Sequence, residues 1–359
     1  MRYWAAFGLA AGLAVGLVGC GGSSGANNTN TPTGGNTAQQ ASGATQTAPS
    51  GKAIKVGLVS DVAGIDDKSF NQSAAEGVRR AAKELGVQQQ IVVSQRPEDY
   101  VNNLSNLAQA GYDLVIAVGF NMEDAAKQVA QQYPKTDFLI IDSSVGDISN
   151  LAAATFKAEQ AGYLVGALAG LVEKDKALPN MNDQNVVGVV GGQEIPPVDD
   201  YIAGFQQGIQ KTDPGAKVLV RYAGKFDDPT TGNQLGELEI SQGADILFPV
   251  AGNTGNGAIQ AAQSHRLYAI GVDSDQSYVA PGTVITSALK RVDVAVYDTV
   301  KAVQQGNFKG GVQTFDLTND GVGMAPVMQG IPQKDVDQVN QLKQQIISGQ
   351  IHISTTVQE

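Results

Sequence analysis

Acidic side chains are the residues whose types and spacing could do chemistry in this sequence. Carboxylates occur in pairs at 66–67, 199–200 and 227–228, and a carboxylate pair can supply the general acid and base of a glycosidase. Each pair also precedes an expected helix, where acidic residues complement the helix dipole and cap free N–H groups. The spacing therefore favours helix starts over a hydrolytic centre.

Other reactive side chains are few. One cysteine and two histidines exclude a disulfide framework, a four-cysteine zinc site and most histidine-rich metal sites. The sequence contains no G-x-x-x-x-G-K-[ST] phosphate loop and no G-x-G-x-x-G after the first strand, and residues 52–359 contain no G-x-S-x-G elbow. His265 and His352 are expected at solvated or capping positions. We predict no enzyme, no metal site and no cofactor.

The elements that position the remaining polar residues are short apolar runs that alternate with helical patterns. The runs are at 54–59, 91–93, 114–118, 138–141, 186–190, 218–220, 246–250, 268–272 and 284–285. This alternation predicts βαβ units in two doubly wound parallel sheets. Ligands of such sheets bind beyond the carboxyl ends of the strands, where the sequence places Asp61, Phe120, Asp142, Gly252 and Asp273.

Length and charge narrow the class of protein further. At 359 residues, with 42% hydrophobic and 16% charged residues, the chain has enough apolar material for two domains. Its formal net charge is −11, whereas a nucleic-acid-binding surface is basic. We therefore expect no nucleic-acid partner.

The N-terminus indicates export. Arg2 precedes an apolar run at 4–18, which is short for a membrane span and typical of a signal peptide. Leu17-Val18-Gly19-Cys20 resembles the lipobox of bacterial lipoproteins, in which the cysteine is acylated. Residues 21–51 carry no charge and are rich in Gly, Ser, Thr, Asn and Gln, a composition that predicts a flexible tether.

The segment at 64–72, GIDDKSFNQ, resembles the opening signature of the basic membrane protein family of substrate-binding lipoproteins, whose best-understood members are of the purine nucleoside receptor A type. This chain has Ala63 where that signature has a glycine. Further matching segments lie at 204–205, 248–255, 271–276, 286–291 and 315–323, so that the resemblance covers nearly all of 54–327.

The resemblance implies a type I periplasmic binding protein, an α/β fold of two lobes with a hinge and a central ligand cleft. Three crossovers would join the lobes near Phe156, Gly282 and Lys309. Lobe one would then comprise 53–156 plus 284–308, and lobe two 157–283 plus 309–359. A signal peptide at 1–19 and a lipidated tether at 20–51 would precede them.

The resemblance also implies a set of ligand-binding residues. Phe70 and Phe248 match the two positions that sandwich the base, although for each of them a place in the core remains an alternative. Asp273 matches the carboxylate that binds ribose, and Lys290 matches a lysine that donates to the sugar oxygens.

The remaining site residues are expected to contact the base or sugar or to line the pocket. Asp61 and Asn71 match polar groups that contact base or sugar, and Asp142 is expected as an acceptor at the base edge. Phe120 and Gly252 are expected to line the pocket.

The implied function is binding. A monomer, lipid-anchored on the extracytoplasmic face of a cell membrane, would bind a purine nucleoside, close around it and deliver it to the permease and ATPase subunits of an ABC importer. Three alternatives remain open: the same fold binding a sugar or autoinducer, a surface-anchored nucleoside hydrolase or glycosidase, and a sensor or adhesin.

Overall fold

Two six-stranded sheets organise the computed structural model, which describes residues 52–358. The first sheet has the order β2-β1-β3-β4-β5-β11, and all of its strands are parallel. Its strands are β1 (Lys55–Ser60), β2 (Gln88–Val93), β3 (Leu114–Val118), β4 (Asp137–Ile141), β5 (Leu151–Phe156) and β11 (Gly311–Phe315).

The second sheet repeats this plan in the order β7-β6-β8-β9-β10-β12, with only β12 antiparallel. Its strands are β6 (Val186–Gly191), β7 (Lys217–Tyr222), β8 (Ala244–Val250), β9 (Tyr268–Asp273), β10 (Val284–Lys290) and β12 (Val322–Met324). The predicted α/β fold with two doubly wound sheets is confirmed.

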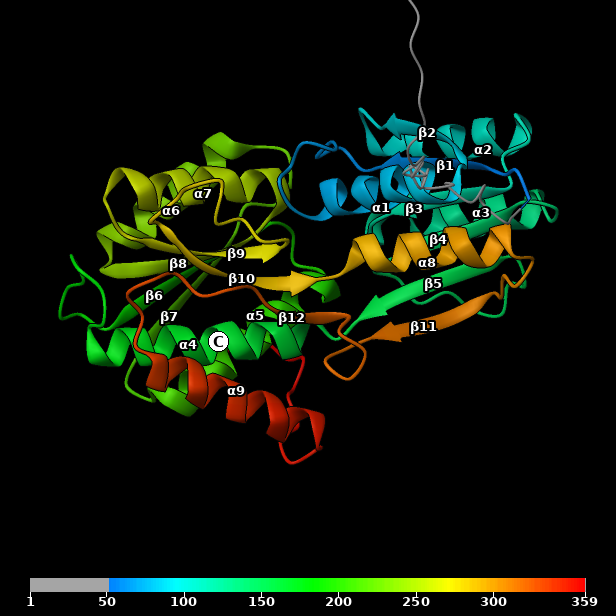
Figure 1. The fold of residues 1–359 in the computed structure, drawn as a ribbon. Helices are drawn as coiled ribbons and strands as arrows, with labels where there is room; N and C mark the ends of the chain where they lie inside the picture. The colour runs from blue at the N-terminus through cyan, green and yellow to red at the C-terminus, as the bar shows by residue number, and fades with distance from the viewer. Residues whose placement is uncertain (1–51, 359) are drawn as a thin grey trace, which may run out of the picture. The chain divides into compact units, whose positions relative to one another are not determined.

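Helices cover both sheets, and we call each sheet with its helices a lobe (Figure 1). Lobe one carries α1 (Phe70–Leu85), α2 (Tyr100–Gln109), α3 (Glu123–Gln132) and α8 (Val292–Gln304), with short 3₁₀ turns at Pro97–Asp99 and Phe120–Met122. Lobe two carries α4 (Ala158–Asp175), α5 (Pro196–Thr212), α6 (Pro229–Ser241), α7 (Gly252–Ser264) and α9 (Gln333–Ile347).

The central strands are buried on both faces, because helices cover each side of a parallel sheet. Every residue of β3, β6, β8 and β9 is buried, whereas the edge strand β11 is largely exposed. This difference explains why the buried strands appear as apolar runs, whereas the exposed edge strand β11 carries none.

The chain changes lobe three times. It does so after Phe156, where β5 leads into α4, after Lys290, where β10 leads into α8, and after Phe315, between β11 and β12. The second and third changes differ from the expected positions at Gly282 and Lys309. The strand at 284–290 therefore lies in lobe two, and the strand at 311–315 lies in lobe one.

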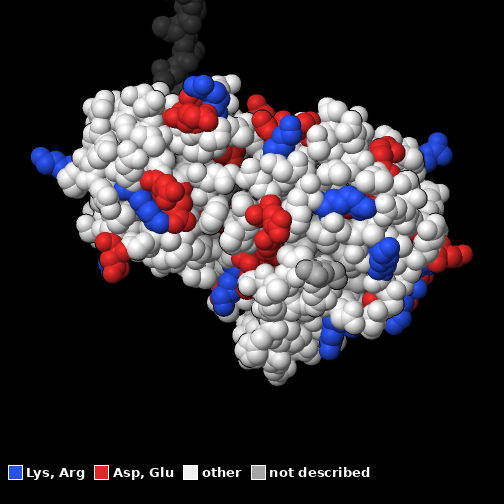
Figure 2. Space-filling view, turned by 180° about the vertical axis from the view of Figure 1, so that it is seen from behind, with Lys and Arg blue, Asp and Glu red and all other residues white. Residues whose placement is uncertain are grey.

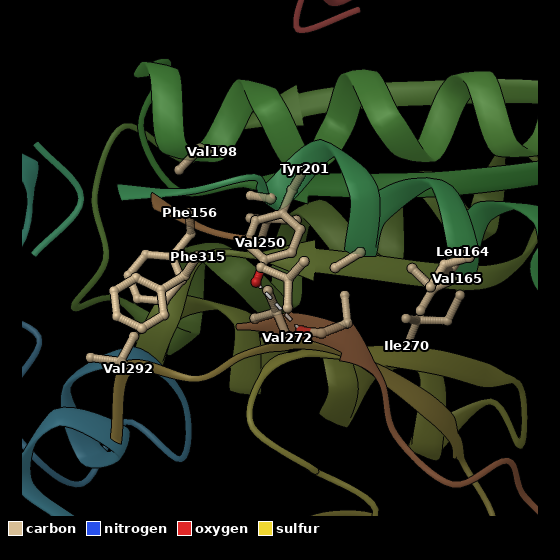
Figure 3. Packing of buried hydrophobic residues seen from close by; sticks show 14 of the residues in the cluster. Phe156, Leu164, Val165, Val198, Tyr201, Val250, Ile270, Val272, Val292 and Phe315 are labelled. Carbon is tan, nitrogen blue, oxygen red and sulfur yellow. Dashed lines mark hydrogen bonds between the residues drawn. The ribbon is translucent and has the colours of Figure 1, made fainter. Parts of the chain in front are cut away.

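Aromatic rings pack where these crossovers meet. Phe156 and Phe315, the last residues of β5 and β11, stack with their ring centroids 5.0 Å apart, and Val292 lies beside them (Figure 3). Two of the three connections between the lobes thus share one apolar contact.

Glycines allow α4 and α5 to pack backbone to backbone. Gly162 and Gly166 on α4 face Gly204 and Gly208 on α5, each pair spaced by four residues. A Cβ at Gly166 would lie 2.2 Å from the carbonyl oxygen of Phe205. This close crossing sets the position of α5, whose first turns reach the site described next.

Candidate functional site

A cavity lies between the two lobes, at the carboxyl ends of their strands. Residues of both lobes line it, and the space between their atoms, open solvent at the mouth included, is about 560 Å³. The strand order reverses between β1 and β3 and between β6 and β8, and parallel α/β sheets bind ligands at such switch points.

The structure brings nearly all of the expected site residues to this cavity. Its wall includes Asp61, Phe70, Asn71, Phe120, Asp142, Gly252, Asp273 and Lys290. Phe248 differs: its side chain is 0% exposed and packs against Phe205 and Tyr201, with ring centroids 4.7 and 6.2 Å away. It lies in β8, which is buried along its whole length, so Phe248 is a core residue.

Phe226 is an aromatic residue that lobe two presents to the cavity in addition to Tyr201. It lies in the loop between β7 and α6, and a Cβ at Gly192 would come within 2.1 Å of its ring. Glycine at 192 therefore makes room for the phenyl ring. Sequence reasoning missed Phe226 because it stands among polar loop residues and in no apolar run.

Two aspartates occupy equivalent places in the two lobes. Asp142 follows β4 and Asp273 ends β9, the corresponding strands of the two sheets, and both residues have φ of 63°. Aspartate tolerates this left-handed conformation better than most residues. The repeated strand-end geometry brings one carboxylate from each lobe into the same cavity.

Lys290 joins the lobes through an ion pair. Its Nζ, at the end of β10 in lobe two, lies 2.6 Å from Oδ2 of Asp142 in lobe one, and both side chains are buried. Burial raises the pKa of Asp142, and the charge of Lys290 opposes that rise. The ammonium also lies 5.0 Å from the ring centroid of Tyr201 and 5.4 Å from that of Phe70, within cation–π range.

Asp273 receives a hydroxyl on each carboxylate oxygen. Ser69 Oγ, from lobe one, donates to Oδ2 at 2.5 Å, and the Tyr201 hydroxyl donates to Oδ1 at 3.3 Å. Burial raises the pKa of Asp273, while the charge of Lys290 and the Ser69 hydroxyl lower it. The site therefore holds an acceptor already surrounded by hydroxyl donors. Tyr201 was not foreseen, since a tyrosine near a helix start resembles a core residue.

Asp61 and Asn71 form a pair on the wall of lobe one. Asp61 Oδ1 accepts from the backbone N–H of Ala63 at 2.9 Å and from Asn71 Nδ2 at 2.7 Å. Burial raises the pKa of the Asp61 carboxyl, and these two hydrogen bonds oppose the rise. No side chain or backbone group within residues 52–358 donates a hydrogen bond to Asp61 Oδ2, so this oxygen is left for a solute.

Two other expectations concern metals and the membrane. Within residues 52–358, no three histidine, cysteine or acidic side chains gather so as to hold a metal ion. None of the helices in that range is long and apolar enough to span a membrane. The expected signal peptide, Cys20 and the tether lie outside the described residues.

Charges are intermixed on the surface. On the face drawn in Figure 2, lysine and arginine alternate with acidic side chains and form no broad basic area. On this face, therefore, no basic area offsets the acidic excess of the whole chain.

Residues 54–356 match the model of the family described as ABC transporter substrate-binding protein PnrA-like. The chain is 30% identical over 322 residues to "ABC transporter nucleoside-binding protein BmpA" of Lactococcus lactis, covering 84% of this chain and 89% of that protein. It is 35% identical over 293 residues to an uncharacterized lipoprotein of Pyrococcus abyssi, covering 78% of this chain and 71% of that one.

Solved structures extend the likeness to the fold. A solute-binding protein of an ABC transporter from Aeropyrum pernix superposes with a TM-score of 0.79 at 30% identity, covering 85% of this chain and 94% of that one. The glucose-galactose binding protein GanP of Geobacillus stearothermophilus gives 0.55 at 16% identity, covering 73% and 95%. The fold is therefore that of the type I periplasmic binding proteins.

Proposed function

This chain belongs to the PnrA-like family of ABC transporter substrate-binding proteins, and from its cavity we propose that the solute it binds is a purine nucleoside. Members of the family bind a solute for an ABC transporter and are not enzymes. The predicted absence of catalysis is thereby confirmed, and the hydrolase alternative is set aside.

One observation carries the proposal: the cavity combines aromatic rings from both lobes with a buried carboxylate, that of Asp273, which already accepts hydrogen bonds from two hydroxyl groups. Phe70 and Phe120 line it from lobe one, and Phe226 from lobe two. Stacking of a base on an aromatic ring is worth about 1–3 kcal/mol. A flat, uncharged base with a hydroxyl-bearing sugar fits these surfaces.

The sugar is assigned to Asp273 and Lys290. Ser69 and Tyr201 each offer a hydroxyl to Asp273, as the vicinal 2′- and 3′-hydroxyls of ribose would. A hydrogen bond to a charged group contributes about 1.5–3 kcal/mol. Lys290, paired with Asp142, donates to the sugar oxygens.

The base is assigned to the rings and to the Asp61–Asn71 pair. Asn71 is held by Asp61 at 2.7 Å, so that its amide is oriented before the solute arrives. Asp142 accepts at the base edge, and Gly252 lets the backbone approach closely. The name of the Lactococcus relative, a nucleoside-binding protein, supports this choice.

The place of the protein follows from its N-terminus. Residues 1–19 act as signal peptide, Cys20 carries the lipid, and 21–51 tether the lobes to the extracytoplasmic face of the membrane. The closed, loaded form then docks on the permease of its importer. The Pyrococcus relative, described as a lipoprotein, supports this assignment.

A thermal-shift panel tests the solute class. The purified chain is melted with guanosine, inosine, adenosine, glucose, arabinose and amino acids. A ligand at 100 times its Kd adds about 2.7 kcal/mol to the free energy of unfolding, which raises Tm by about 4 °C in a protein of this size. A shift with sugars and none with nucleosides would overturn the proposal.

A further inference from the structure

Lobe two donates hydrogen bonds to successive residues of the loop between β1 and α1 of lobe one. The carbonyl oxygen of Asp67 accepts from Asn256 Nδ2 at 2.9 Å. The carbonyl oxygen of Lys68 accepts twice, from Ser274 Oγ at 2.9 Å and from Gln276 Nε2 at 3.1 Å. These bonds use the backbone of lobe one, so the identity of the lysine side chain is irrelevant to them.

The next residue extends the contact. Ser69 Oγ lies 3.3 Å from the carbonyl oxygen of Val272 and 2.5 Å from Oδ2 of Asp273. Residues 67–69, which we call the clasp segment, therefore join lobe two through hydrogen bonds to α7, to the end of β9 and to the residues that follow β9.

Gln276 is positioned for this contact by its own lobe. Its side chain is 2% exposed, and its Oε1 accepts from the backbone N–H of Val272 at 2.8 Å. Its own backbone N–H donates to Ser287 Oγ at 3.0 Å. With the oxygen occupied inside lobe two, the amide nitrogen is directed at Lys68 across the boundary between the lobes.

The clasp segment also adopts a backbone shape that its sequence does not favour. Lys68 has φ of 61°, a left-handed conformation that costs energy for a residue with a side chain. Such a conformation persists where the surroundings impose it. The two hydrogen bonds on its carbonyl oxygen supply that constraint.

We propose that Ser274 and Gln276 are positioning residues, which hold the clasp segment on lobe two and thereby set how fully the closed cavity forms. Neither residue lines the cavity. The clasp segment leads directly into Phe70 and Asn71, which do. When the clasp segment binds lobe two, the Phe70 ring and the Asn71 amide therefore come to lie over the solute. When the clasp segment leaves lobe two, both groups move away from it.

This arrangement predicts a specific pattern of affinities. The apparent Kd of a solute equals its intrinsic Kd divided by the fraction of protein in the closed form. A residue that acts only on that fraction weakens every solute by the same factor. A residue that contacts the solute weakens some solutes more than others.

The test uses two substitutions in the whole chain. Gln276→Glu retains an oxygen for Val272 but replaces the donor to Lys68 with an acceptor, and we expect affinity for guanosine to fall about 10-fold or more. Ser274→Ala removes one hydroxyl, and we expect a fall of about 2- to 10-fold. Inosine and adenosine should lose affinity by the same factor, measured by calorimetry, with faster release.

A distance measurement without solute completes the test. Spin labels at Asn106→Cys on α2 and Gln234→Cys on α6 report the lobe separation in a chain that also carries Cys20→Ser. We expect both variants to give longer or broader distances than the parent chain. Gln260→Glu, the same change at an exposed residue of α7, serves as the control and should leave distances and affinity unchanged.

The outcomes separate this inference from the proposed function on which it rests. Unchanged distances in both variants, or losses that differ between guanosine and adenosine, overturn the role of Ser274 and Gln276. If no nucleoside binds the parent chain while both variants still lengthen the distance between the spin labels, the nucleoside proposal is wrong. The positioning role of Ser274 and Gln276 is then retained.

Discussion

At the scale of single residues, Asp273 has the most direct predicted effect on solute choice. Replacing Asp273 with alanine removes the acceptor assigned to the ribose hydroxyls, so we expect ribonucleoside affinity to fall about 10- to 100-fold. A free purine base offers no sugar and should lose far less. Calorimetric titration of guanosine and guanine into both chains measures the difference. Equal losses for the two would remove Asp273 from the sugar site.

Phe226 and Phe248 form a matched pair of aromatic residues from the same lobe. Phe226→Ala should weaken nucleoside binding about 5- to 100-fold, since base stacking is worth about 1–3 kcal/mol, with little change in unfolding. Phe248→Ala should instead cost about 3–5 kcal/mol of stability, because it empties a fully buried site. Urea unfolding and calorimetry measure both effects. The reverse pattern would return Phe248 to the binding site.

Residue type and position predicted much of this cavity, because strand ends are recognisable and aspartate at a strand end is informative. Asp142 and Asp273 follow apolar runs, and both reach the cavity. Phe226 follows no such run. Phe248 stands inside one, and a run buried on both faces hides all of its side chains. Sequence alone does not distinguish a ring that faces a cavity from one that faces the core.

At the scale of elements, the crossing of α4 and α5 depends on glycine. Gly166→Ala would place a methyl group 2.2 Å from the carbonyl oxygen of Phe205, and backbone cannot move aside as a flexible side chain can. We expect a loss of about 3 kcal/mol in urea unfolding, at the upper end for overpacking. Gly146→Ala is the control, because nothing lies within 4 Å of its added Cβ. Similar stability of the two variants would contradict the close crossing.

The packing of α6 on β6 encloses a buried acid. Glu239 is 0% exposed, Gly188 of β6 leaves space for its carboxyl group, and burial raises its pKa to about 8. The folded protein then binds a proton that the unfolded chain releases above its usual pKa of 4.5. Stability should therefore fall as the pH rises from about 5 to 8.

Glu239→Gln removes that dependence. We expect the variant to match the parent chain at pH 5 and to exceed it by about 1–3 kcal/mol at pH 8, since a buried charge is no longer forced to form. Urea unfolding at the two pH values measures the gain. Glu76→Gln, at an exposed residue of α1, should show no such trend. A gain of equal size at pH 5 would rule out ionisation of Glu239 as the cause.

Element order was predictable, but the lobe to which each late strand belongs was not. The strand at 284–290 continues the second sheet, and the one at 311–315 returns to the first. Pairing at a sheet edge is decided by the neighbouring strand and not by the composition of the strand itself. β11 is largely exposed and β12 has three residues, so neither carries the apolar signal that marks β1 or β8.

At the scale of the whole molecule, we expect charge to decide whether the proposed site binds a nucleoside or its phosphorylated form. The chain has a net charge of −11. Among residues 52–358, the cavity wall holds Asp61, Asp67, Asp142 and Asp273 and one cation, Lys290, which is already paired with Asp142. An added phosphate group would meet these carboxylates, and the described part of the wall offers no unpaired cation to neutralise it. The same carboxylates do not repel an uncharged nucleoside.

We therefore expect guanosine 5′-monophosphate to bind at least about 100-fold more weakly than guanosine, since juxtaposed like charges cost several kcal/mol. Because these carboxylates are buried, raising the salt concentration should change the ratio of the two dissociation constants little. Competition of both compounds against a fluorescent nucleoside, at low and high salt, measures the ratio. Lys290→Met, which removes a positive charge from the cavity wall, should increase the ratio of the nucleotide Kd to the nucleoside Kd. Equal binding at low salt would mean that the phosphate lies outside the cavity, with the carboxylates playing no part in selection.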